Sequence, residues 1–428
     1  MSRPWYGWVV VGLWLSSTLS GFVVVFNIGI LLPSIADDMG LSPGQQGLLG
    51  SAAFWGNLFL AIPLGWWTSR FSPKAVIAST LALGTLLILL QGWSPAFAVL
   101  LIGRLCFGVV LMAMEPPGAA LISQWFPPHR IVFVNSVANV VFSLTMGLGL
   151  LATPLILGAL GGDWRMSFYV SGTLFALLTI AWLLFGRDRH RRQRQGGEAA
   201  GDREPATPST TLRATMAHKD LLLACLGMAG AVLAWSAFLS FFPSLMLDRY
   251  GVSLNWSGAL LAINLAVGGV SGLVMAFVVA RTRRVNRILV VIGVSMTGGY
   301  AAMTLTGSIP LLVLFAAVSG LSGAYFPLLY SVAFQLRGVT ADRIPVAVAT
   351  VMTAVSLGTL LGPMLTGFLQ EAFGELRLPL IIASASGLLL LPVGAFITIG
   401  HARESAAEQP GEALDSVSPP GPAKKELT

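Results

Sequence analysis

Two ionisable residues, Arg104 and Glu115, lie deep inside apolar stretches of the sequence, and both belong to the stretch 97–124. A charge inside a membrane costs at least about 2.5 to 3.5 kcal/mol on insertion scales, so residues of this kind usually serve a function. Eleven residues of a regular helix turn through about 1100°, which predicts that the two side chains share one helix face, roughly 16 Å apart. We expect Arg104 to attract an anionic group or to bind backbone carbonyls, and Glu115 to bind a proton. Either residue could instead only brace neighbouring helices.

The same stretch contains the run Glu115-Pro116-Pro117-Gly118. Its two prolines remove two backbone donors, which predicts a kink or break that leaves carbonyl groups free to face a cavity. Pro327 could have the same effect in the stretch 309–336. A bend that only relieves packing is the alternative, because proline is common in membrane helices.

Membrane-spanning helices are the elements that must position these residues. The 428 residues are 55% apolar and only 10% charged, with a mean hydropathy of +0.80, whereas a soluble domain carries about 25% charged residues. Apolar stretches long enough to cross a membrane recur along the chain, and they are too long and too uniform for the strands of a barrel. We therefore predict an all-α membrane protein of twelve spans. They are residues 7–33, 46–68, 75–93, 97–124, 131–158, 166–186, 221–247, 256–280, 288–306, 309–336, 344–370 and 378–400.

The placement of charge predicts how the spans are oriented. The net charge is +7 and the sequence pI is 9.8. Nearly all of the 25 Lys and Arg residues fall on the side of the chain ends, while the loops of the other side keep only Arg165, Arg249 and Arg377. The positive-inside rule then places both termini in the cytoplasm of a multi-pass protein in the inner membrane. The basic charge is explained by topology, so we expect no nucleic-acid partner.

The chain repeats itself at an offset of about 210 residues, which predicts two pseudo-symmetric bundles of six helices. The repeated features are Pro33-Ser34 and Pro243-Ser244, Gly40-x-Ser42 and Gly251-x-Ser253, Gly149-x4-Pro154-x3-Gly158 and Gly358-x4-Pro363-x3-Gly367, and Pro117 and Pro327. Residues 1–186 and 220–400 form the two bundles, and the charged segment 187–219 is predicted to be a cytoplasmic linker. The tail 401–428 is predicted to be disordered. Two parallel repeats place a substrate near the midplane, between the halves.

The loop after the second span resembles the gating signature of the major facilitator superfamily. It keeps Gly65, Arg70 and Lys74, but Ser69 stands at the position of the acidic residue and Ser72 at that of the second glycine. In the second half, Arg281 and Arg284 are the corresponding remnants. The resemblance implies that these residues hold helix ends together on the cytoplasmic side.

The fourth span resembles the anion:cation symporters and their monocarboxylate relatives within that superfamily. Arg104-x3-Gly108 matches a family element, and Pro117 and Trp125-Phe126-Pro127 follow at a similar spacing. The sequence departs from that branch at Leu111, where several anion symporters have a glutamate. It also has no basic residue inside spans two, eight and eleven.

The resemblance implies that spans one, four, seven and ten line a central cavity. The polar and aromatic residues on these spans and their neighbours are candidate substrate ligands, because amides grip carboxylates and aromatic rings stack on flat groups. Each could instead join two helices, for about 0.6 kcal/mol. The candidates are Asn27, Asn57, Asn139, Trp235, Ser236, Asn264, Tyr325 and Tyr330.

These features together predict a secondary transporter that carries a small organic solute by alternating access, coupled to protons, with a monocarboxylate-like anion as first choice. A proton-driven efflux pump and a non-transporting membrane sensor or scaffold are the alternatives. We find no nucleotide-binding loop and no HExxH motif. We therefore expect no enzymatic activity, no cofactor and no metal, and a monomer in the lipid bilayer.

Overall fold

The computed structural model describes residues 6–68, 70–188, 218–281, 285–334, 336 and 344–397. Most of the expected linker and the whole tail 401–428 lie outside these residues. Within them the secondary structure is helical, and no strand occurs. The predicted all-α class is therefore confirmed.

The first half of the chain forms the helices of spans one to six. They are α1 (Tyr6–Phe26), α2 (Ile28–Met39), α3 (Pro43–Thr68), α4 (Pro73–Trp93), α5 (Phe97–Met112), α6 (Glu115–Trp125), α7 (Pro128–Ala159) and α8 (Trp164–Phe185).

The second half forms spans seven to twelve in the same order. Its elements are α10 (Lys219–Tyr250), α11 (Leu254–Arg281), α12 (Val285–Met303), α13 (Ile309–Gly320), the 3₁₀ segment η1 (Leu321–Ala324), α14 (Tyr325–Val332), α15 (Ile344–Phe373), α16 (Arg377–Ala385), the 3₁₀ segment η2 (Ser386–Leu389) and α17 (Leu390–Phe396).

Eleven segments of the described chain are long and apolar enough to cross a membrane. The remaining segment of the expected twelve is α3, a helix of 26 residues. Their large apolar side chains are exposed on the outside, as on α8, where Leu177 and Leu184 are more than half exposed. Such exposure suits contact with lipid, in which a helix satisfies its own backbone hydrogen bonds.

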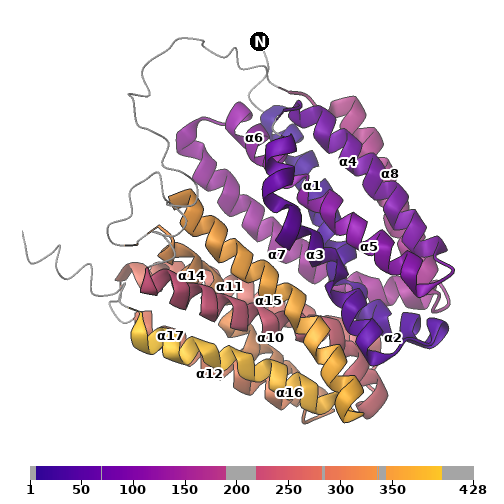
Figure 1. The fold of residues 1–428 in the computed structure, drawn as a ribbon, viewed down its shortest axis with the longest axis vertical. Helices are drawn as coiled ribbons and strands as arrows, with labels where there is room; N and C mark the ends of the chain where they lie inside the picture. Colours follow the sequence, from indigo (N-terminus) through magenta and orange to yellow (C-terminus); the bar gives the residue numbers. More distant parts are fainter. Residues whose placement is uncertain are drawn as a thin grey trace, which may run out of the picture.

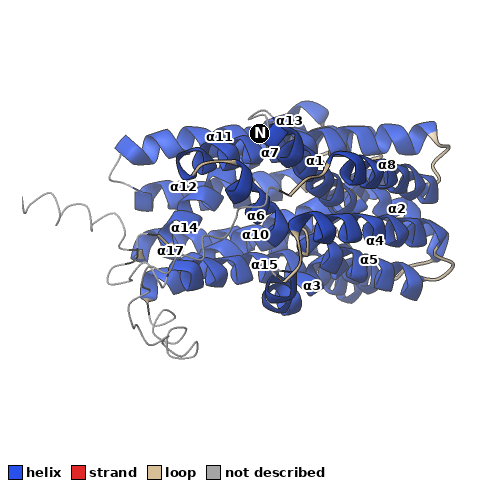
Figure 2. Ribbon diagram, turned by 90° about the horizontal axis from the view of Figure 1, so that it is seen from above, coloured by secondary structure: helices blue, strands red, loops and turns tan. Residues whose placement is uncertain are grey.

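The helices of the two halves form two groups that lie side by side (Figure 1). Where the groups meet, α3 packs against α15, α2 against α10, and α7 against α11. Seen from above, the helices run roughly parallel to one another (Figure 2). We call the end of the bundle at which α1 begins and α17 finishes the terminal end, and the opposite end the distal end.

Glycines bring the two halves together at related places near the distal end. A Cβ atom on Gly47 of α3 would lie 2.7 Å from the carbonyl oxygen of Pro363 in α15, and one on Gly258 of α11 would clash with the carbonyl oxygen of Leu150 in α7. Gly47 and Gly258 are about 210 residues apart, so the repeat recognised in the sequence builds the contact between the halves twice. Small residues of this kind allow helices in membranes to approach closely.

Four of the described spans, one, four, ten and twelve, are interrupted near their middle, span twelve by η2. Span one breaks at Asn27, between α1 and α2. Span four breaks at Ala113 and Met114, and span ten passes through η1. Span seven, in contrast, is the continuous helix α10. Transporters commonly build their midplane sites from such discontinuous helices, because the broken ends expose polar backbone groups.

Candidate functional site

An aromatic cluster joins the two halves at the level of the breaks. The ring of Phe26, the last residue of α1, lies 5.2 Å from the ring of Trp235 in α10 and 5.6 Å from that of Phe54 in α3, centroid to centroid. A cavity of about 10 Å³ lined by Phe26, Phe54, Ser236 and Ser240 lies beside the cluster. That volume holds about one water molecule and no organic solute. The cluster therefore closes the contact between the halves at this level.

Arg104 braces three helices in this structure. Its side chain is fully buried. Its Nε donates a hydrogen bond to the carbonyl of Leu49 in α3 at 2.9 Å, and its Nη atoms donate to the carbonyls of Val24 and Val25 in α1. Of the two roles expected for Arg104, this geometry matches the binding of backbone carbonyls. A buried guanidinium held in this way keeps its charge satisfied without a carboxylate.

Glu115 lies at the break of span four, and its side chain is exposed. The turn at Ala113 and Met114 interrupts the regular helix on which the expected shared face of Arg104 and Glu115 relied, and Arg104 is buried whereas Glu115 is exposed. Ten residues of α6 separate Glu115 from the terminal end of its span, a rise of about 15 Å, so the carboxylate lies near the middle of the membrane.

The exposed stripe that begins at Glu115 continues one and two helical turns later at Ala119 and Ser123. The exposed stripe on the neighbouring α7 consists of large apolar residues, such as Leu144 and Leu148. A carboxylate that faced hydrocarbon would cost several kcal/mol, so an exposed Glu115 fits a water-filled path better than a lipid-facing surface.

The prolines explain the break at Glu115, as the sequence predicts. Pro116 and Pro117 have no N–H group to donate to the carbonyls of Met112 and Ala113. The Met114 carbonyl accepts hydrogen bonds from the Gly118 N–H at 3.2 Å and from the Trp14 indole at 3.1 Å. Trp14 of α1 was not among the expected residues. A side chain on Gly118 would clash with the Trp14 ring, so this glycine makes room for it.

The break in span ten is lined by a neutral polar network. The amide nitrogen of Asn264 in α11 donates to Ser319 Oγ at 2.8 Å and to the Ala316 carbonyl at 3.3 Å. The Tyr300 hydroxyl donates to Asn264 Oδ1 at 3.5 Å. Tyr325, the first residue of α14, is buried next to this network and makes no hydrogen bond with a described residue. Its role as a substrate ligand stays a prediction.

Asn27 and Ser236 join helices within their own halves. The Asn27 amide donates to Thr153 Oγ1 and to the Gly149 carbonyl of α7, and the Ser236 hydroxyl donates to the Gly358 carbonyl of α15 at 3.3 Å. Asn27 and Ser236 are about 210 residues apart in the sequence, and so are their partners Gly149 and Gly358. They match the alternative reading of these residues as helix-joining groups.

The remaining expected ligands fall in three places. Trp235 is half-buried in the aromatic cluster, and the Tyr330 ring stacks on that of Phe326 with centroids 6.1 Å apart. The side chains of Asn57 and Asn139 lie outside the described residues.

Part of the expected gating loop is described. The Lys74 N–H donates to Asp188 Oδ1 at 2.9 Å, and Ser72 caps the start of α4 by accepting the Ala75 N–H at 3.3 Å. Arg70 is exposed at the turn before α4. The expected gating residues Gly65, Arg281 and Arg284 have no described side-chain surroundings. The role of the loop stays a prediction.

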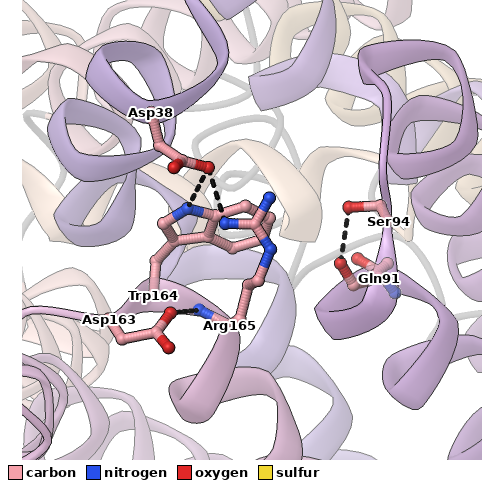
Figure 3. Close-up of polar contacts among 6 residues, drawn as sticks. All are labelled: Asp38, Gln91, Ser94, Asp163, Trp164 and Arg165. Atoms are coloured by element: carbon pink, nitrogen blue, oxygen red, sulfur yellow. Dashed lines mark hydrogen bonds and ion pairs between the residues drawn. The ribbon is translucent and has the colours of Figure 1, made fainter.

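Polar contacts at the distal end were not expected from the sequence. Asp38, at the end of α2, accepts hydrogen bonds from Arg165 Nη1 at 2.6 Å and from the Trp164 indole at 3.2 Å (Figure 3). The hydrogen bond from Arg165 lowers the pKa of Asp38 below its ordinary value, although burial acts in the opposite direction. This ion pair ties the end of α2 to the start of α8.

One distal contact crosses between the halves. The carboxylate of Glu371 in α15 accepts the Gly44 N–H of α3 at 3.1 Å. Gly44 is in the first turn of α3, where free N–H groups and the helix dipole favour a negative charge. Glu371 thus fastens the distal end of one half to the other.

Metal binding has no support in the described part of the chain, where no group of three or more His, Cys, Asp or Glu residues is placed to hold an ion.

Comparison with known proteins identifies the family. Residues 13–339 match the Major Facilitator Superfamily, and the chain belongs to it. The chain is 23% identical over 394 residues to the probable sulfoacetate transporter SauU of Cupriavidus necator, covering 87% of this chain and 88% of that protein. It is 25% identical over 387 residues to the 3-(3-hydroxy-phenyl)propionate transporter of Escherichia coli, covering 87% and 89%.

The fold agrees with this assignment. The crystal structure of a bacterial homolog of the human lysosomal transporter Spinster, in an inward-facing and unoccupied conformation, superposes with a TM-score of 0.71 at 20% identity. The match covers 96% of this chain and 98% of that one. The protein is thus a multi-pass membrane transporter and not an enzyme.

Proposed function

We propose that the protein is a proton-coupled secondary transporter of a small organic anion, with a monocarboxylate as its first substrate class. It works by alternating access in the inner membrane, with both termini in the cytoplasm. The observation that carries the proposal is the exposed carboxylate of Glu115 at a helix break near the middle of the membrane. A carboxylate in that position can take up a proton in one conformation and release it in the other.

The relatives support an organic anion as the substrate class. The two proteins compared above carry names that specify sulfoacetate and 3-(3-hydroxy-phenyl)propionate, both of which are organic acids. Their identity to this chain is low, so they support a class of substrate and no particular compound.

The contacts of Arg104 bear on how an anion would be recognised. Because Arg104 is engaged by carbonyl groups, we assign recognition of the substrate to neutral groups near the breaks, above all the Tyr325 hydroxyl and the Trp235 ring. A site that contacts its substrate mainly through neutral groups suits an anion with one charge better than one with several.

The contacts between the halves support a conformation that opens toward the terminal end. The aromatic cluster, the paired glycine contacts and the Glu371 hydrogen bond fasten the middle and the distal end. In this state Glu115 exchanges its proton with the cytoplasm. Release of the distal contacts would open the path to the other side.

The test uses purified protein in liposomes with a pH gradient, and a panel of radiolabelled sulfoacetate, arylpropionates and hexuronates. We expect Glu115→Gln to abolish accumulation driven by the gradient while substrate exchange across the membrane continues. Glu375→Gln serves as the control, because Glu375 is an exposed carboxylate at the distal end. Unchanged accumulation in Glu115→Gln would remove this residue from the mechanism, and loss of exchange as well would point to a structural role.

A further inference from the structure

An apolar groove runs along the outer surface of the second half, between α11 and α12. Both helices pack against α13 and η1, which form the back of the groove. Val270 and Val274 of α11 and Val291 of α12 line it and are more than half exposed, and Leu321 of η1 lies at its back. The cavity has a volume of about 710 Å³.

The length of the groove matches one leaflet of a membrane. On α12 its lining extends from Arg287 to Ser295, a rise of about 12 Å, and on α11 from Met275 to Ala266, about 13 Å. Half of the hydrocarbon thickness of a bilayer is about 15 Å. The groove therefore reaches from the terminal end of the spans to about the middle of the membrane.

A cation stands at the terminal end of the groove. Arg287 lies in the first turn of α12, its side chain is exposed, and it makes no hydrogen bond or ion pair with a described residue. The first turn of a helix also favours anions through its free N–H groups and its dipole. The hydroxyl groups of Ser271 and Ser295, farther along the groove, are hydrogen-bonded within their own helices. The charged group that lines this groove is thus a cation at one end, which suits an anionic partner.

We propose that this groove is a binding site for an anionic phospholipid. One acyl chain lies between α11 and α12, and the phosphate group contacts Arg287. The apolar lining, the length of one leaflet and the charge at the interface fit the two parts of such a lipid. Because the acyl chain of the lipid packs on Leu321, the bound lipid touches the outer side of the 3₁₀ segment that interrupts span ten. The site is separate from the path at Glu115.

The experiment is native mass spectrometry of the full-length protein in detergent, titrated with phosphatidylglycerol or phosphatidylcholine. We expect phosphatidylglycerol to be retained preferentially, and Arg287→Gln to weaken its binding about fivefold, as one cation at a membrane surface contributes roughly 1 kcal/mol. Lys219→Gln is the matched control, an exposed cation at the terminal end outside the groove. Equal losses in both variants, or no loss in Arg287→Gln, would overturn the proposal.

A second pair of variants tests the acyl chain. Val274→Trp fills the groove and is expected to reduce retention of both lipids, while Val294→Trp, at an equally exposed residue of α12 outside the lining, is expected to leave it unchanged. Glycerol phosphate without acyl chains distinguishes a lipid from a free phosphate. If it displaces phosphatidylglycerol at equal concentration, the site recognises the phosphate alone and the lipid proposal fails.

Discussion

Spans four and ten occupy equivalent places in the two halves, yet the chemistry at their breaks differs. The helix after the break begins at Glu115 in the first half and at Tyr325, about 210 residues later, in the second. Each is followed two residues later by a proline of the repeat, Pro117 or Pro327. The first half thus has an exposed carboxylate where the second has a buried hydroxyl. A shared backbone break therefore does not require shared side-chain chemistry.

The helix contacts beside the breaks likewise repeat in their backbone geometry and differ in their polar side chains. Gly108 of α5 packs against the carbonyl of Ala53, and Gly320 of α13 packs against the carbonyl of Asn264. Next to the first contact lies the cation Arg104, and next to the second lies the neutral network of Asn264, Ser319 and Tyr300. The close approach of the backbones is repeated, while the polar groups are not. Under the proposed function, the charged half carries the proton and the neutral half contributes more to substrate binding.

Among the predictions that test this comparison, removal of Arg104 has the largest expected effect on stability. Arg104→Ala leaves a cavity and three carbonyls without a charged donor, so we expect the free energy of unfolding to fall by about 3 kcal/mol or more. Asn264→Ala, in the neutral network, should cost about 1 kcal/mol. Thermal unfolding in detergent measures both. Equal losses would show that the two halves depend equally on their polar groups.

The repeated glycine contacts give the next largest effect. We expect Gly108→Ala to destabilise the protein by about 1 to 3 kcal/mol, because its Cβ would overlap the Ala53 carbonyl. Gly320→Ala should cost less, since its Cβ would lie 2.7 Å from the Asn264 carbonyl oxygen. Gly298→Ala, with nothing within 4 Å, is the control and should stabilise α12. A larger loss for Gly320→Ala in thermal unfolding would contradict this order.

Tyr325→Phe sharpens the contrast with Glu115. Loss of one hydroxyl to the substrate should raise KM up to about tenfold, equivalent to roughly 0.5 to 1.5 kcal/mol, and leave the pH dependence of uptake unchanged. Initial rates in liposomes at several pH values measure both quantities. A shifted pH profile would instead place Tyr325 in the proton path.

The smallest expected effect concerns the ion pairs at the distal end. Arg165 and Asp38 lie 2.6 Å apart in the first half, and Arg249 and Glu375 lie 3.9 Å apart in the second. Because the pKa of Asp38 is lowered in the folded protein, its stabilisation is present above the ordinary pKa of aspartate and is lost as the pH falls through the lower folded value.

We therefore expect the protein with Asp38→Asn to lose less stability on acidification than the unchanged protein, as measured by melting temperatures between pH 6 and pH 3. The difference should be less than about 1 kcal/mol, since both partners are partly exposed. Glu375→Gln should change the same profile less. An unchanged profile in Asp38→Asn would assign the acid sensitivity to other groups.

Several features of this protein could be predicted from residue types and spacing alone. Long apolar runs determine helices, because a backbone in hydrocarbon has to satisfy its own hydrogen bonds. Pro116 and Pro117 determine a break, because neither can donate to the preceding turn. The offset of about 210 residues predicts two similar bundles, and Gly47 and Gly258 make related contacts between them. These signals are local or periodic, so they can be recognised in the sequence without knowing which residues lie close together in space.

The tertiary structure decided what the polar residues do. Arg104 and Glu115 looked alike as charges in one apolar stretch, but packing buried the first against the carbonyls of α1 and α3, and the turn at Ala113 and Met114 left the second exposed. Asp38 finds Arg165 only because the ends of α2 and α8 meet. The groove at Arg287 exists only because α11 and α12 both pack against α13 and η1. Such partners lie tens to hundreds of residues apart in the chain, and only the packing of whole helices brings them together.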